Sequence, residues 1–363
     1  MRLYLYVSDQ VVKFQQTSNM KIINTLPSFI YKKTPPKNFN EKDEFLIETK
    51  REESIPEMNL YSIDHAWLYE DGSIFKNNKL VIESLRDGGM INVYNWRRKL
   101  KNLFFRKIKS EHSLNISIND HWSHEYYHWF FEALPRLVFI KQNLNKDFNI
   151  YLSHRHKKQY ISESLKSLGV SKVTYLPKKS KVYLDNLYFS DYAGPSDFHR
   201  QELLLAIKEH FPKKTPSRNI FISRQNARYR KILNIDEVTK ILTKHNFEIV
   251  FAEDLNFSEQ VDLFSNTKNL ISIHGAGLTN ILFMQPNTNI LEIRKNSWGM
   301  LKDNTLESSK FYNTYYHICN LTKLNYYYLN AKANDDLISC HFADLNVDVR
   351  KLENTIKEML SPH

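Results

Sequence analysis

The second half of the chain alternates short apolar runs with amphipathic stretches. Apolar runs bounded by turn residues predict strands at 219–223, 247–252, 269–273 and 289–293. Helical spacing of apolar positions predicts a helix at 235–245, with Asp236 and Glu237 suited to its first turn. A second helix is predicted at 258–265, capped by Ser258. Strands that alternate with helices favour a mostly parallel sheet.

The first half shows the same alternation after an irregular start over residues 1–60. The pattern predicts strands around the Asp71-Gly72 turn and at 115–119, 148–152 and 173–176. Helices are predicted at 123–141, interrupted at Pro135, and at 157–168, closed by Gly169. Both halves therefore predict an α/β fold.

The Lys/Pro/Thr stretch at 212–216 is typical of a linker between domains. We expect two facing Rossmann-like domains, at 1–212 and 213–343, each with a mostly parallel sheet. The tail, 344–363, is expected to form one helix that packs back on the N-terminal domain. No repeat at solenoid periods is present.

Composition restricts the class of protein. A hydrophobic fraction of 42%, with no apolar run long enough to span a bilayer, predicts a soluble cytoplasmic protein. The net charge of +11 favours anionic partners such as nucleotides or a membrane surface. Nucleic acid is not expected, because no zinc-finger, KH or RNP pattern accompanies the charge. Cys319 and Cys340 are too few for a disulfide scaffold.

One candidate site lies in the segment 121–137. His124-Glu125-x-x-His128 fits the zinc-protease pattern, in which two histidines one helical turn apart bind the metal. A third histidine at the metzincin spacing is missing, because Phe131 and Leu134 hold the key positions. A zinc-dependent hydrolase therefore remains an alternative rather than the leading hypothesis.

A second candidate site follows two strand ends in the second half. After the strand at 269–273, His274-Gly-Ala-Gly opens a short helix, whose amides can seat a diphosphate. Arg224 and Arg230 follow the strand at 219–223, and ligands of α/β sheets bind at this edge. Arg228 is interpreted as a solvated residue.

Taken together, these segments resemble glycosyltransferase family 61. The resemblance is carried, in order and in register, by Tyr126–Leu137, Ile222–Asn234, Glu253–Gln260, His274–Asn280 and Phe283–Ile293. One position departs from the family pattern: Glu125 stands where an Asn is expected, and this substitution creates the zinc-like pattern.

The resemblance implies a GT-B fold and inversion at the anomeric carbon, with a UDP-sugar as co-substrate and no essential metal or other cofactor. The donor would lie in the C-terminal domain and the glycan acceptor, lipid-linked in one version of the hypothesis, on the N-terminal one. Donor-binding candidates are Arg224, Arg230, His274, Gly275, Ala276, Gly277, Leu278, Thr279 and, at the ribose hydroxyls, Glu292. Acceptor-side candidates are Tyr126, Trp129 and Arg136.

Inversion requires a base that deprotonates the acceptor hydroxyl. His128 and Glu132 lie one turn apart, so either could be that base, or one could orient the other. A purely structural role, with Glu132 paired to Arg136, is the competing interpretation. The leading hypothesis is thus an inverting glycosyltransferase of surface polysaccharide (capsule or lipopolysaccharide) biosynthesis. A non-catalytic protein that binds nucleotides or glycans is the remaining alternative, and membrane association through the basic surface is a further hypothesis.

Overall fold

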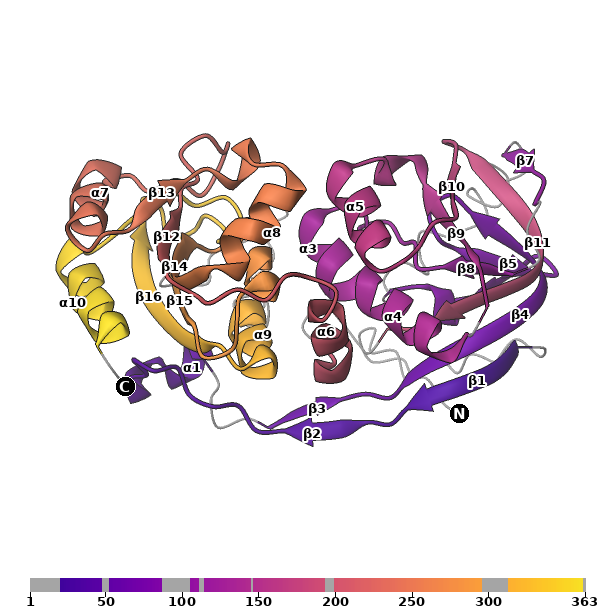
Figure 1. The fold of residues 1–363 in the computed structure, drawn as a ribbon, viewed down its shortest axis with the longest axis horizontal. Helices are drawn as coiled ribbons and strands as arrows, with labels where there is room; N and C mark the ends of the chain where they lie inside the picture. Colours follow the sequence, from indigo (N-terminus) through magenta and orange to yellow (C-terminus); the bar gives the residue numbers. More distant parts are fainter. Residues whose placement is uncertain are drawn as a thin grey trace. The chain divides into compact units, whose positions relative to one another are not determined.

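The structure, a computed structural model, describes residues 20–47, 52–86, 105–110, 114–144, 146–192, 199–295 and 313–361. It divides into two compact units (Figure 1). The first comprises residues 1–29 and 55–198, and the second comprises 30–54 and 199–363. The second unit thus includes residues 30–54 and 199–212, which the sequence interpretation assigned to the N-terminal domain.

The first unit is built on a mixed sheet in the order β10-β9-β8-β11-β4-β5-β6, with β1 beside β4 and β7 beside β11. Its strands are β1 (Met20–Leu26), β4 (Met58–Tyr69), β5 (Ile74–Lys76), β6 (Lys79–Val81), β7 (Arg106–Ile108), β8 (Asn115–Ser117), β9 (Asn149–Ser153), β10 (Val173–Leu176) and β11 (Ser180–Ser190). The pairs among β10, β9, β8, β11 and β7 are parallel. Those that join β11, β1 and β5 to β4 are antiparallel, as is the β5–β6 pair.

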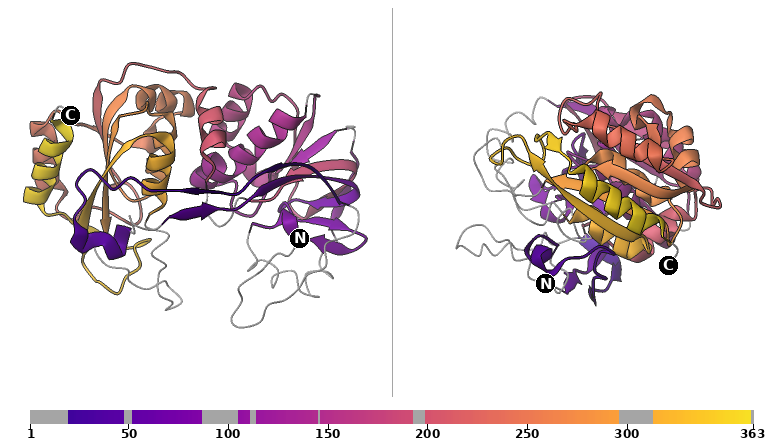
Figure 2. Two further views of the ribbon diagram at one scale, coloured as in Figure 1. Left: turned by 90° about the horizontal axis from the view of Figure 1, so that it is seen from below. Right: turned by 90° about the vertical axis from the view of Figure 1, so that its left-hand side faces the viewer.

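One face of this sheet carries α3 (Tyr126–His128), α4 (Leu134–Asn143) and α5 (Gln159–Ser167) (Figures 1 and 2). Between α3 and α4, residues 129–133 form a π turn in which the Leu134 N–H bonds to the Trp129 carbonyl. Pro135 follows this π turn inside a continuous helical segment, and the wider turn accommodates a residue that has no N–H to donate. The helix begins at Tyr126 rather than at Ser123 as expected, because Glu125 has an extended backbone.

The second unit has the sheet order β13-β12-β14-β15-β16-β17. Its strands are β12 (Arg218–Ile222), β13 (Glu248–Val250), β14 (Thr267–Ile273), β15 (Asn289–Lys295), β16 (Asn325–Ala333) and β17 (Leu345–Asn346). All pairs are parallel except β16–β17. The prediction of an α/β fold with largely parallel strands is confirmed.

Helices cover both faces of this sheet: α7 and α10 lie on one side, and α8 and α9 on the other (Figure 1). The helices of this unit are α1 (Glu44–Ile47), α6 (Gln201–Lys208), α7 (Ile235–Lys244), α8 (Phe257–Ser265), α9 (Thr314–Thr322) and α10 (Val349–Leu360). A separate two-stranded sheet pairs β2 (Phe29–Tyr31) with β3 (Glu53–Ile55). The cap of α8 is Asn256, in a capping box with Glu259, rather than Ser258 as expected.

The C-terminal helix belongs to the second unit. Leu352, Ile356 and Met359 of α10 are buried in the same apolar cluster as residues of α7, β14 and β15. The expectation that the tail packs on the N-terminal domain is therefore wrong: the apolar face of α10 is already covered. The helix is also shorter than expected, because residues 345–346 form β17 and Asp348 caps α10.

Two smaller sequence expectations concern cysteines and membrane spans. Cys319 and Cys340 are both buried and unbonded to each other. Over the described ranges, no helix combines the length and apolarity needed to cross a bilayer.

Candidate active site

Two loops meet at the carboxyl edge of the second unit's sheet. Arg224 follows β12, and Gly275 follows β14, which is the strand beside it. A Cβ atom placed on Gly275 would lie 2.9 Å from Arg224 Nη1 and 3.2 Å from Arg230 Nη1. Both guanidiniums therefore converge on the glycine turn, and a side chain at this position would displace them.

The two guanidiniums are close to each other and largely enclosed. Burial and the charge of Arg230 lower the pKa of Arg224 to about 10. Burial also lowers the pKa of Arg230. The Nε atoms of both residues are buried and lack a hydrogen-bond partner in the described part of the chain. Two half-buried like charges that lie this close form a site suited to an anion.

The position of Arg230 is fixed by the segment that leads to α10. Asn234 exchanges two hydrogen bonds of 2.9 Å with the backbone of Val347, and the Lys231 N–H donates to Asp344. Arg230 itself has φ of 61°, a left-handed conformation that costs a non-glycine residue about 1–2 kcal/mol. Its Nη1 donates to the carbonyl of His274 at 3.1 Å. The strained backbone of Arg230 is therefore held by the hydrogen bonds of the segment that follows it and by the bond from its own side chain to His274.

The side chain of His274 is oriented by Glu292. Its Nδ1 lies 2.5 Å from Glu292 Oε1, and Tyr326 donates its hydroxyl proton to Glu292 Oε2 at 2.5 Å. Glu292 is 0% exposed, and because each of its oxygens holds a partner, it orients His274. Its expected contact with ribose hydroxyls stays a prediction.

The glycine turn continues into a short helix, as expected, and this helix is a 3-10 helix, Ala276–Phe283. Leu278 and Thr279 are 0% exposed, and the Leu278 N–H donates to the Gly275 carbonyl at 2.9 Å. These two residues therefore build the turn, in contrast to their expected contact with the donor. Ala276 is exposed and Gly277 half-buried, so their part of the backbone can reach a ligand.

In the first unit, His128 and Glu132 are bonded to each other. His128 Nδ1 lies 2.9 Å from Glu132 Oε2, and Arg86 donates to Glu132 Oε1 at 2.8 Å. An ionised carboxylate only accepts hydrogen bonds, so Nδ1 carries the proton and Nε2 carries the lone pair. The side chain of His128 is 22% exposed, whereas that of Glu132 is 6% exposed. Glu132 pairs with Arg86 rather than with Arg136, the partner in the competing interpretation.

Two of the three residues expected on the acceptor side are enclosed within the first unit. Trp129 is 0% exposed and donates to Ser164 Oγ. Arg136 is 2% exposed and donates to the carbonyls of Ile118 and Ser190. Their contact with an acceptor is not supported, because they act as framework residues. Tyr126 is half-buried, with its ring against Phe130 and Tyr160.

The zinc-protease arrangement is not formed at His124-Glu125-x-x-His128. His124 lies in the turn before α3, so the two histidines do not share a helix face. Each ring bonds a different carboxylate, His124 with Glu125 and His128 with Glu132. Across the described ranges, no three His, Cys, Asp or Glu side chains converge as metal ligands.

Several residues of these sites escaped the sequence analysis. Arg86 and Tyr326 lie outside every recognised motif, and no local pattern points to them. Trp122 lies inside the segment 121–137 and is 48% exposed. A tryptophan within a motif-bearing segment was the signal that could have identified it, because its ring offers a large aromatic face to a ligand.

A parallel α/β unit with an anion seat at its carboxyl edge is the arrangement of proteins that bind nucleotides. Comparison with known proteins is more specific. Residues 126–291 match the family model described as Glycosyltransferase 61, and this stretch includes the His128, Arg224 and Gly275 segments. This part of the chain is therefore similar to glycosyltransferase family 61.

Among its relatives are two kinds of sugar transferase. The chain is 34% identical over 114 residues to alpha-1,3-arabinosyltransferase XAT2 of Oryza sativa subsp. japonica, over 30% of this chain and 18% of the relative. It is 40% identical over 79 residues to the EGF domain-specific O-linked N-acetylglucosamine transferase of Drosophila melanogaster, over 20% of this chain and 15% of the relative. The matches thus span less than a fifth of each relative's length.

Proposed function

We propose that the protein is an inverting glycosyltransferase that moves a sugar from a nucleotide-sugar, UDP-linked, to a hydroxyl of a glycan acceptor. The observation that carries the proposal is the convergence of Arg224 and Arg230 on Gly275. Two half-buried guanidiniums close to each other are stabilised when an anion such as a diphosphate neutralises them. The match of residues 126–291 to the family 61 model and the names of the relatives support the same reaction class.

Departure of the nucleotide builds negative charge on the diphosphate. Arg224, Arg230 and the backbone at Gly275–Gly277 are fixed before the reaction, so they can stabilise this charge without reorganisation. His274 is oriented by the buried Glu292 toward the same turn. This set of donors supports leaving-group stabilisation without an essential metal.

The base in the proposed reaction is His128. Glu132 is held by Arg86 and accepts from Nδ1, so Nε2 is the basic atom of the ring. In the reaction, Nε2 takes the proton of the acceptor hydroxyl while the hydroxyl oxygen bonds to the anomeric carbon and the C–O bond to the diphosphate breaks. Glu132 stabilises the imidazolium that forms, and is therefore a positioning residue.

A role in surface polysaccharide synthesis, at the cytoplasmic side of a membrane, is part of the proposal. Its support is the net charge of +11, which favours binding to anionic lipid headgroups. Sedimentation with vesicles of phosphatidylcholine, with and without phosphatidylglycerol, tests the membrane part. Equal binding to both vesicle types would remove it.

The catalytic proposal is tested by release of UDP from a panel of UDP-sugars. Wild type is expected to turn over at least one donor, and Arg230→Ala is expected to lose donor binding. His128→Ala is expected to keep donor binding and to lose transfer. Arg228→Ala is the matched control, because Arg228 lies on the same loop but is exposed. Full activity in the Arg230 and His128 variants would refute the site.

A further inference from the structure

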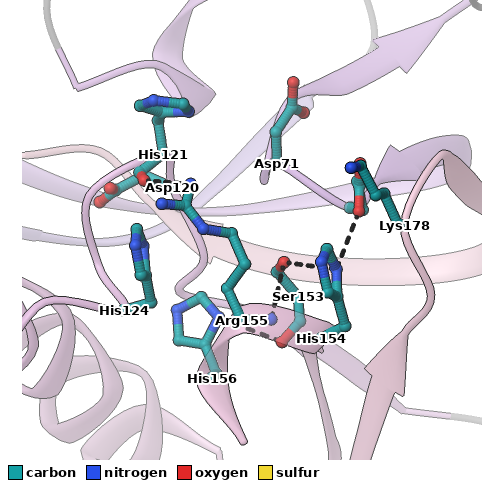
Figure 3. A pocket seen from close by; sticks show the side chains of 10 residues that line it. Asp71, Asp120, His121, His124, Ser153, His154, Arg155, His156 and Lys178 are labelled. Atoms are coloured by element: carbon teal, nitrogen blue, oxygen red, sulfur yellow. Dashed lines mark hydrogen bonds and ion pairs between the residues drawn. The ribbon is translucent and has the colours of Figure 1, made fainter.

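The first unit contains a polar cavity of about 410 Å³ at the carboxyl end of β9 (Figure 3). This volume lies within the range of small-molecule sites. Figure 3 shows the Arg155 side chain extended between His124 and His154, toward Asp120. The cavity is lined by Glu70, Asp71, Asp120, His121, His124, Ser153, His154, Arg155, His156 and Lys178.

The charge of this lining differs from that of the arginine site in the second unit. Three carboxylates, Glu70, Asp71 and Asp120, are opposed by Arg155 and Lys178, which gives a formal charge of −1 with neutral histidines. Although the whole chain carries +11, this cavity does not concentrate positive charge. Carboxylates beside imidazoles and cationic donors suit hydroxyl groups, because a hydroxyl both donates and accepts.

The wall of the cavity is preorganised. His156 Nδ1 donates to the Ser153 carbonyl at 3.2 Å, so Nε2 accepts the hydroxyl proton of Ser123 at 2.9 Å. Burial lowers the pKa of His156 to about 3, which keeps the ring neutral. Asp120 Oδ1 accepts the N–H groups of Trp122 and Ser123. These bonds fix the turn that carries His121 and Trp122.

Trp122 connects the cavity to the candidate base. Its ring lies 5.2 Å from the ring of His121, which lines the cavity, and 6.0 Å from the ring of His128. Its side chain is one of the few large apolar groups on the surface of the described residues, at 48% exposed. Aromatic faces bind the apolar faces of pyranose rings, with hydroxyl groups held by polar neighbours.

We propose that Trp122 and the cavity lined by His121 and Asp71 form a binding site for an uncharged sugar residue of the acceptor. The proposal rests on the proposed function and names the chemistry of its acceptor side. Trp122 stacks on the sugar ring beside His128, and the carboxylates and imidazoles of the cavity bind the hydroxyl groups. Trp122 thus takes the acceptor-binding role that the sequence suggested for Trp129, which is enclosed in the core.

The test is binding of methyl glycosides in the absence of donor, by saturation-transfer NMR and by quenching of tryptophan fluorescence. The panel contains methyl glucoside, methyl galactoside, methyl N-acetylglucosaminide, methyl arabinoside and the charged methyl glucuronide. Wild type is expected to bind at least one neutral glycoside more tightly than the glucuronide. Trp122→Ala is expected to weaken that binding about tenfold, and Trp122→Phe to weaken it less.

The control is Trp67→Phe, which changes a half-buried tryptophan of the same unit on β4 and is expected to bind as wild type does. Circular dichroism establishes that each variant is folded. Unchanged binding in Trp122→Ala, tighter binding of the glucuronide, or no saturable binding of any neutral glycoside would overturn the proposal. The proposed donor site is tested independently, by binding of UDP in the absence of acceptor to wild type and to variants of the second unit. Loss of UDP binding would therefore refute the donor site, whereas loss of glycoside binding would refute the acceptor site.

Discussion

Replacing Arg224 by methionine should make the ligand-free protein more stable while it abolishes nucleotide binding. Burial and the charge of Arg230 lower the pKa of Arg224 to about 10. Because arginine in water titrates above pH 12, this corresponds to about 3 kcal/mol of unfavourable free energy for the charged form in the folded state. The folded pKa lies below the unfolded one, so the whole penalty is present at neutral pH.

Methionine keeps an unbranched apolar side chain at this position and removes the charge. We expect Arg224→Met to raise the free energy of unfolding by about 1–3 kcal/mol, the upper limit being the full penalty. A change of 1 kcal/mol shifts the melting temperature of a domain of this size by about 2–4 °C. The ligand-free variant should therefore melt about 2–12 °C above wild type.

The assay is thermal unfolding with and without UDP. In wild type, saturating UDP should raise the unfolding free energy, by about 2.7 kcal/mol at one hundred times its dissociation constant. Arg224→Met should lose this increment, whereas the control Arg228→Met should keep it and melt as wild type does, since Arg228 is exposed on the same loop. A variant that melts below wild type and still responds to UDP would refute the reasoning.

Three further predictions concern the first unit and the C-terminal segment. Glu132→Gln should lower kcat by about 10²-fold or more with unchanged donor affinity, because His128 loses the carboxylate that fixes its tautomer, as steady-state kinetics will show. Asn234→Ala should cost about 1–3 kcal/mol in chemical denaturation and weaken UDP binding, because two hydrogen bonds to Val347 are lost. His156 has a pKa of about 3 in the folded state, below its unfolded value, so its contribution to stability is lost as pH falls from about 6.5 toward 3. In urea titrations, His156→Gln should therefore reduce the fall in the free energy of unfolding over this range by about 1.4 kcal/mol per pH unit. A denaturation profile of the His156 variant parallel to wild type over this range would contradict the last prediction.

The elements of the second unit were largely predictable from its sequence. Apolar runs such as 269–273 and amphipathic stretches such as 235–245 lie within a residue or two of β14 and α7. Their periods reflect local geometry, which the sequence records directly. The tail was misassigned because an amphipathic pattern shows that a helix buries one face but does not show which element covers that face. In the structure, α10 packs against α7 and β16.

The candidate sites were predicted in part. Glycine and arginine after adjacent parallel strands must meet at one sheet edge, and Arg224, Arg230 and Gly275 do. The role of Glu292 could not be read from its position, because only tertiary packing brings Tyr326 and His274 to its two oxygens. Arg86 contacts Glu132 across 46 residues, a separation that no local pattern encodes.

The proposed reaction inverts the anomeric carbon of a nucleotide-sugar while protein side chains stabilise the charge of the diphosphate. Proton NMR of the anomeric region, recorded during turnover of a UDP-sugar in the presence of EDTA, tests both features in one experiment. We expect a product of anomeric configuration opposite to the donor's, formed at the same rate as without the chelator. A product that keeps the donor's configuration would contradict it.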